Sequence, residues 1–285
     1  MPMLYQKRNR GLFNPKDSAP FKVSRSKIDL FLECPRCFYL DRRLGVPRTS
    51  GFPFTLNSAV DQLLKKEFDI HRAAGTSHPL MEAYGIKAVP FSHENMGVWR
   101  ENFVGVQCLH KPTNLLITGA VDDIWVNEKG ELSIVDYKAT SKEGTVNLDA
   151  EWQSGYKRQM ETYQWLLRQS GFEVSDTGYF VYANGKSDRA AFDGKLEFDV
   201  IIIPYKGSDA WIEKTLFKLK ENLMLSSVPA PSPICEYCTY IKTVNGETGV
   251  GENSEEKDLD APKKKTVTKK KVASKKIEAQ SESLF

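Results

Sequence analysis

The stretch GAVDDIWVNEKGELSIVDYKAT, residues 119–140, reads as two strands joined by a short turn. Its middle, Glu128-Lys129-Gly130, fits a three-residue hairpin loop whose last residue is a left-handed glycine. Such a loop fixes the register of the two strands and sets Ile124 opposite Ile134. The stretch therefore predicts a β-hairpin whose second strand ends in polar residues.

Acidic side chains face each other across this hairpin. The same register sets Asp122 opposite Asp136, and Lys138 follows two residues later on the same face. Opposed like charges destabilise a sheet unless a cation lies between them, and Mg²⁺ prefers carboxylate, water and phosphate oxygens as ligands. A lysine beside the metal can orient or deprotonate the attacking water, or steady negative charge in the transition state. The alternative is that Asp122 or Asp123 is a surface residue and that Asp136 and Lys138 form a simple ion pair.

Composition places the chain among soluble globular proteins, because 40% of its 285 residues are hydrophobic and 27% are charged. No apolar run approaches the roughly eighteen residues that a membrane span needs. The first residues carry charges but no apolar stretch typical of a secretory signal, so we expect a cytoplasmic, reducing location. No phosphate-binding P-loop motif is present, so any ATP-driven motor would lie on another chain.

Charge is unevenly distributed along the chain, although the net charge is only +3. Residues 1–23 form a basic segment, and residues 246–285 combine an acidic block with lysine clusters and few apolar residues. Such a composition cannot bury enough surface to offset the entropy of ordering, so a disordered tail is predicted there. The lysines could bind nucleic-acid phosphates or serve only as a solvated tail.

Between these ends, residues 24–245 are predicted to form one α/β domain, with a central mixed sheet flanked by helices. Apolar residues recur at helical or strand spacing along this region. The expected helices cover residues 28–44, 55–74, 150–169 and 208–225, and the expected strands cover residues 102–110, 115–126, 131–139, 177–183 and 196–204.

At this point the motifs resemble a known family, the PD-(D/E)XK nuclease superfamily with its restriction-endonuclease-like core. More narrowly, they resemble the RecB-type branch, which includes CRISPR-associated iron–sulfur exonucleases. Gly119 and Asp122 match the G-x-x-D motif of that branch, and Asp136-Tyr137-Lys138 matches its D-x-K motif. The resemblance implies a nuclease fold and hydrolysis of phosphodiester bonds in DNA.

The resemblance also implies a ligand set. Asp122, Asp136 and the main-chain carbonyl of Tyr137 would bind Mg²⁺ or Mn²⁺, and Lys138 would position the water. The branch usually has a histidine ligand on an earlier helix, where this chain has Asp61. An aspartate can also bind these metals, so Asp61 is a further candidate ligand.

Further resemblance lies downstream, where Gln159 and Tyr163 match the Q-x-x-x-Y helix of the branch. Their spacing places both side chains on one face of a helix, from which they would contact the substrate strand. The implied function is a metal-dependent DNA nuclease that acts on single-stranded DNA or DNA ends in repair, recombination or CRISPR adaptation, with a helicase or another subunit as partner. The alternative is a nucleic-acid-binding protein with this fold and no turnover.

Four of the five cysteines form two C-x-x-C pairs, Cys34 with Cys37 and Cys235 with Cys238. Two such pairs at opposite ends of a domain predict one four-thiolate metal site. A [4Fe–4S] cluster is the first expectation, because the resembling nucleases hold one between early and late cysteines, and Zn²⁺ is the alternative. Cys108 is expected to be a small core residue.

Overall fold

The computed structural model describes residues 5–49, 51 and 54–248. The chain divides into one unit of residues 1–242 and another of residues 243–285. The fold below is that of the first unit. The lysine-rich tail predicted for residues 246–285 lies outside the described residues from 249 onward.

The first unit contains two mixed β-sheets, which confirms the predicted α/β class and divides its strands between two sheets. In the three-stranded sheet the order is β1-β4-β3, with β1 parallel to β4. In the five-stranded sheet the order is β2-β5-β6-β7-β8, with β6 parallel to β7. The strands are β1 (Phe21–Ser24), β2 (Ala88–Pro90), β3 (Val106–His110), β4 (Leu115–Gly119), β5 (Asp123–Asn127), β6 (Leu132–Thr140), β7 (Thr177–Gly185) and β8 (Phe198–Lys206).

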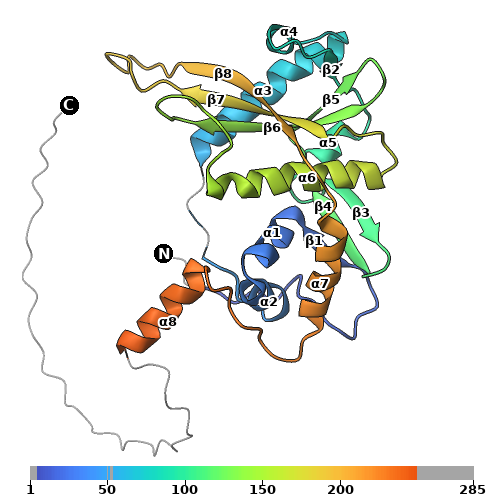
Figure 1. The fold of residues 1–285 in the computed structure, drawn as a ribbon, viewed down its shortest axis with the longest axis vertical. Helices are drawn as coiled ribbons and strands as arrows, with labels where there is room; N and C mark the ends of the chain where they lie inside the picture. Colours follow the sequence, from blue (N-terminus) through green and yellow to red (C-terminus); the bar gives the residue numbers. More distant parts are fainter. Residues whose placement is uncertain (1–4, 50, 52–53, 249–285) are drawn as a thin grey trace, which may run out of the picture. The chain divides into compact units, whose positions relative to one another are not determined.

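Helices cover both faces of the five-stranded sheet (Figure 1). On one face, α3 packs Leu64 and Phe68 against Trp125 and Val135. On the other face, α6 contacts strands of both sheets and so closes the space between them. The described helices are α1 (Arg25–Glu33), α2 (Pro35–Arg43), α3 (Thr55–Ala74), α4 (Pro79–Ala83), α5 (Met96–Trp99), the short η1 (Glu151–Gln153), α6 (Ser154–Gln169), α7 (Ile212–Met224) and α8 (Glu236–Thr248).

The prediction of one continuous strand over residues 115–126 is wrong, because the chain leaves one sheet and enters the other at residues 120–122. There the backbone N–H of Val121 bonds the carbonyl of Trp99 instead of a strand partner. Gly119 ends β4 directly under α6, and a Cβ added to it would lie 2.6 Å from the ring of Tyr163. The glycine of the G-x-x-D motif therefore lets α6 approach the crossing point.

A second correction concerns the helix predicted over residues 28–44, which is interrupted at Cys34. Proline has no N–H and disfavours helical backbone in the residue before it. Cys34 precedes Pro35 and is extended, with φ −158° and ψ 106°. The interruption makes Cys34 the N-cap of α2 rather than an interior helix residue.

The basic segment predicted at 1–23 packs onto this unit over its described part. Phe13 is buried in the core shared by α6 and α7, and β1 pairs with β4. Arg8 forms an ion pair with the buried Asp41 of α2. These contacts make residues from about 8 onward part of the folded unit.

None of the described helices is both long enough and apolar enough to cross a membrane.

Candidate active site

The hairpin predicted from the sequence is present with the predicted register. Ile124 lies opposite Ile134, and the N–H of Asn127 donates to the carbonyl of Glu131 at 3.1 Å. Gly130 ends the loop with φ +80°, the left-handed conformation that the loop type requires. β6 continues past the hairpin and presents Asp136 and Lys138 on the face covered by α6.

Asp136 is fully buried, with 0% of its side chain exposed to solvent. Its ion-pair partner is Lys138, and no other described group donates a hydrogen bond to either carboxylate oxygen. Burial raises the pKa of Asp136 to about 6, although Lys138 opposes the shift. A buried carboxylate with so few donors has unused ligand capacity, which suits a metal ion.

Asp122 lies just before β5 and turns its carboxylate toward the end of β6. Its Oδ2 accepts a hydrogen bond from the backbone N–H of Tyr137 at 3.1 Å. Its Oδ1 accepts one from the Nζ of Lys65 at 3.0 Å. The structure thus brings Asp122 to the D-x-K motif, as the register predicted.

Lys65, which the sequence reasoning missed, lies between two of the predicted metal ligands. Its Nζ donates to Asp61 Oδ2 at 2.8 Å as well as to Asp122. Burial and the charge of Asp122 raise the pKa of Asp61. The i, i+4 spacing of Asp61 and Lys65 on a predicted helix was the signal that could have identified this pair.

The predicted carboxylate ligands do not converge tightly. Among the described residues, the four cysteines are the group of metal-binding side chains whose ligand atoms all lie within 4.8 Å of one another. Asp61, Asp122 and Asp136 do not form such a group, and the ammonium of Lys65 lies between the carboxylates of Asp61 and Asp122. Tyr137 contributes its N–H to Asp122 and turns its ring to the opposite face, among the residues under α3.

Lys138 lies against both acidic and aromatic neighbours. Burial opposes its charge, but Asp136 and Asp122 outweigh burial and raise the pKa of Lys138. Its Nζ also lies 4.6 Å from the centre of the Tyr156 ring, a favourable position for a cation. In the metal-free protein Lys138 is therefore protonated, and it can donate hydrogen bonds to an anion rather than accept a proton.

Gln159 and Tyr163 meet as the helical spacing predicted. The Nε2 of Gln159 donates to the Tyr163 hydroxyl at 3.1 Å. Tyr163 is only 4% exposed and packs beneath Gly119. Tyr163 thus orients Gln159, whose side chain is the more accessible of the two.

A cavity of about 510 Å³ lies beside Asp122 and Lys138. Its walls come from the start of α3, the end of β6 and the first turn of α6. The lining residues are Phe54, Asn57, Ser58, Val60, Asp61, Leu64, Asp122, Tyr137, Lys138, Ala139 and Tyr156. The cavity gives a substrate access to Asp122 and Lys138.

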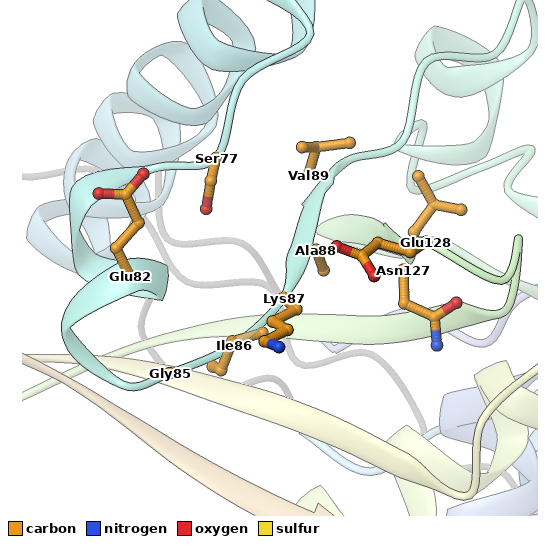
Figure 2. Close-up of a pocket in the computed structure, with 10 residues that line it drawn as sticks. Ser77, Glu82, Gly85, Ile86, Lys87, Ala88, Val89, Asn127 and Glu128 are labelled. Carbon is orange, nitrogen blue, oxygen red and sulfur yellow. The ribbon is translucent and has the colours of Figure 1, made fainter.

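Figure 2 shows a second cavity, of about 560 Å³, between α4 and the ends of β2 and β5. Glu82 lies on one wall and Glu128 on the opposite wall, with Lys87 between them (Figure 2). This lining has no excess of cations to bind phosphate and contains none of the predicted site residues. We therefore assign the chemistry to the cavity beside Lys138.

Asp123, the neighbour of Asp122, belongs to a separate network on the α3 side of the hairpin. It forms ion pairs with Arg72 and Arg100. It also accepts hydrogen bonds from the Tyr137 hydroxyl at 2.6 Å and from the N–H of Ile124 at 2.8 Å. Both oxygens of this buried carboxylate therefore have partners.

The four predicted cysteine ligands converge, as the two C-x-x-C pairs indicated. The Sγ atom of Cys37 lies 3.6 Å from that of Cys235 and 3.7 Å from that of Cys238, and Cys34 lies 3.9 Å from Cys238. Four thiols so arranged can bind Zn²⁺ or an iron–sulfur centre, and the donor set alone does not select between them. Cys108 lies apart on β3, partly buried.

The cysteines of this cluster differ in the pKa of their thiols. Burial opposes ionisation of Cys34, but hydrogen bonds from the backbone of Ser232 and Cys37 lower the pKa of Cys34 to about 7. Burial and the neighbouring sulfurs raise the pKa of Cys238. Cys34 therefore ionises readily, and its negative charge opposes ionisation of the neighbouring thiols. A bound cation would be needed to hold all four cysteines as thiolates.

Among the comparisons with known proteins, the match to a family model is the one that bears on these motifs. A solved structure titled "Crystal structure of SSO0001" is similar over 80% of this chain and 87% of that chain, with 15% sequence identity and a TM-score of 0.33. No curated protein matches the chain. The model of the PD-(D/E)XK nuclease superfamily matches residues 55–243, more than half of the 285 residues. The chain therefore belongs to the PD-(D/E)XK nuclease superfamily.

Proposed function

We propose that the protein is a metal-dependent nuclease of the RecB-type branch that hydrolyses phosphodiester bonds in DNA. The observation that carries this proposal is the buried carboxylate of Asp136, which has Lys138 as its ion-pair partner and no other described donor. A structural carboxylate at this depth would be surrounded by donors, as Asp123 is. A carboxylate that binds a metal needs oxygen lone pairs that are not already occupied by hydrogen bonds.

Asp122 and Asp136, with the main-chain carbonyl of Tyr137, would hold Mg²⁺ or Mn²⁺. The donors fit such an ion because they are hard oxygens and because the Asp136 oxygens have no described partner besides Lys138. The ion would supply Lewis-acid polarisation of the phosphate and a more acidic bound water. Asp61 would become a further ligand of the ion only if the ammonium of Lys65 moves away from its carboxylate.

The protein's own side chains have distinct roles in this proposal. Lys138, held protonated by Asp136 and Asp122, donates to a phosphate oxygen and stabilises the charge that develops during hydrolysis. Gln159 contacts the substrate strand. Tyr163 positions the Gln159 side chain through the hydrogen bond between them. Tyr156, which lines the cavity, keeps Lys138 directed into it.

An exposed tryptophan beside the cavity favours a single-stranded substrate. Trp152 lies in η1, where its side chain is 68% exposed and packs edge-on against Tyr156. Unpaired bases stack on such rings, at about 1–3 kcal/mol per base. Trp152→Ala should weaken binding of single-stranded DNA severalfold, whereas Phe192→Ala, another exposed aromatic, should not.

The proposal also covers the partners of the protein and its location in the cell. A helicase or other recombination or CRISPR subunit would supply unwound DNA, since the sequence carries no P-loop. The lysine-rich tail would add salt-sensitive affinity for DNA. The cytoplasmic location predicted from the sequence suits thiolate ligands, which need a reducing compartment.

A second candidate function is DNA binding without turnover, and the position of Lys65 favours it. An ammonium between Asp61 and Asp122 substitutes for part of the cation charge of a metal site. The two functions are separated by incubating the full chain with labelled single-stranded DNA in Mg²⁺, in Mn²⁺ and in EDTA. Cleavage in either metal and none in EDTA supports the nuclease, whereas binding without cleavage in all three supports the alternative.

A further inference from the structure

The four cysteines carry an inference that goes beyond the nuclease site and does not depend on it. We infer that Cys34, Cys37, Cys235 and Cys238 bind a single tetrahedral Zn²⁺ ion, and not the [4Fe–4S] cluster that the resemblance to iron–sulfur exonucleases implies. The inference rests on the spacing of the sulfurs, their burial, and the local structure that presents them.

The sulfur spacing matches one small ion. A tetrahedral zinc site with Zn–S bonds of about 2.3 Å places its sulfurs about 3.8 Å apart. Three of the six separations in the cluster are 3.6, 3.7 and 3.9 Å, and all four sulfurs lie within 4.8 Å of one another. The thiols are therefore as close together as the ligands of a single zinc ion.

A [4Fe–4S] cluster would need a wider arrangement. Each of its four thiolates binds a different iron, so a cage of iron and sulfide atoms separates the cysteine sulfurs. Here Cys34, Cys37 and Cys235 are buried and packed together with Leu30. Inserting the cage would require the two cysteine pairs to move apart.

Both pairs are presented in the same way, at the start of a helix. Cys34 is the N-cap of α2 and Cys37 lies in its first turn; Cys235 directly precedes α8, and Cys238 lies in its first turn. In each pair the carbonyl of the first cysteine accepts a hydrogen bond from the residue four positions on, at 3.1 Å from Phe38 and at 2.9 Å from Thr239. Two matching C-x-x-C turns that face each other are typical of structural zinc sites, and helix N-termini stabilise thiolates.

Neighbouring donors offset the charge of such a site, since four thiolates around Zn²⁺ leave two negative charges. The Nη2 of Arg48 lies 3.5 Å from Cys235 Sγ, and the N–H of Ser232 donates to Cys34 Sγ at 3.5 Å. Arg48 is itself held by Glu33 at 2.6 Å and by the ring of Tyr237. The site would fasten the segment before α8 to α2, and its binding energy would add to folding stability.

The test is metal analysis of the full chain, expressed in medium supplemented with both iron and zinc and purified without oxygen. We expect about one zinc per chain, no stoichiometric iron or acid-labile sulfide, and no brown colour. Replacing zinc by Co²⁺ should give the visible spectrum of a tetrahedral tetrathiolate. Iron and sulfide in equal stoichiometric amounts, or a protein that binds neither metal, would overturn the inference.

Two variants locate the ion. Cys238→Ser should lower the zinc content and the melting temperature, whereas Cys108→Ser, on β3, should retain the zinc of the wild type. If Cys238→Ser does not fold, the wild-type metal content and its Co²⁺ spectrum still decide the question. Cleavage of DNA in Mg²⁺ is measured separately, so failure of the nuclease proposal leaves this result intact.

Discussion

Two buried aspartates on one hairpin, Asp123 and Asp136, have opposite surroundings. Asp123 faces α3 and is bonded by two arginines, a tyrosine hydroxyl and a backbone N–H. Asp136 faces α6 and has Lys138 as its partner, with no further described donor. Both are 0% exposed, so burial does not distinguish them.

The difference separates a structural acid from a functional one. A buried charge with a complete set of partners is costly to remove, because its arginines would then be left unpaired. A buried charge with few partners destabilises the fold and persists where function needs its lone pairs. The predictions below alter one aspartate or its surroundings and follow both cleavage and stability.

The largest expected effect is on cleavage. Asp136→Asn and Lys138→Ala should each reduce metal-dependent cleavage of single-stranded DNA by about a thousandfold or more, since each removes charge from the reacting centre. Both variants should keep the circular dichroism spectrum of the wild type. Substantial residual cleavage by both would place the chemistry elsewhere.

Asp123→Asn should act on stability instead. Breaking its buried ion pairs should lower the free energy of unfolding by about 3–5 kcal/mol. Urea denaturation monitored by tryptophan fluorescence measures this loss, and Asp136→Asn serves as the matched variant, with a smaller loss expected because Lys138 keeps the charge of Asp122 nearby. Equal destabilisation by the two substitutions would remove the distinction between the two acids.

The raised pKa of Asp136 predicts a pH dependence of stability. The folded protein binds a proton at Asp136 with a pKa of about 6, whereas an unfolded aspartate has a pKa of about 3.9. In EDTA, the wild type should therefore gain stability relative to Asp136→Asn as the pH falls from about 7 to about 4, by at most about 1.4 kcal/mol per pH unit. Saturating Mg²⁺ should remove this gain near pH 6, and a pH-independent difference in EDTA would contradict it.

A smaller effect is expected from Lys65, whose ammonium lies between Asp61 and Asp122. Lys65→Met should lower the Mn²⁺ concentration needed for half-maximal binding severalfold, because it frees two carboxylates from a competing cation. Lys66→Met, an exposed lysine on the same helix, is the control and should leave that concentration unchanged. Weaker Mn²⁺ binding in Lys65→Met would show that the lysine supports the site rather than competes with the ion.

The hairpin could be predicted because short-range rules decide it. Gly130 fixes the loop, the loop fixes the register, and the register brings Asp122 beside the D-x-K motif. The convergence of the two C-x-x-C pairs could be predicted for a different reason, because four thiolates are a common ligand set for one metal centre.

Features that depend on tertiary packing were not predicted. The strand break at 120–122 follows from the approach of α6 to Gly119, which no local pattern shows. The distinction between Asp122 and Asp123 depends on Arg72 and Arg100, about fifty and twenty residues earlier in the chain. Lys65 was missed because an i, i+4 acid–lysine pair on a helix usually reads as a solvated surface pair.

Binding of Mn²⁺ tests the central claim most directly, because it needs no knowledge of the true substrate. The free ion is counted by electron paramagnetic resonance while the wild type, Asp136→Asn and Asp123→Asn are titrated in parallel, with the cysteine site already loaded with zinc. The account predicts saturable binding to the wild type and to folded Asp123→Asn, and loss of that binding in Asp136→Asn. Undiminished binding to Asp136→Asn, or no binding to the wild type, would contradict the assignment of Asp136 as a metal ligand.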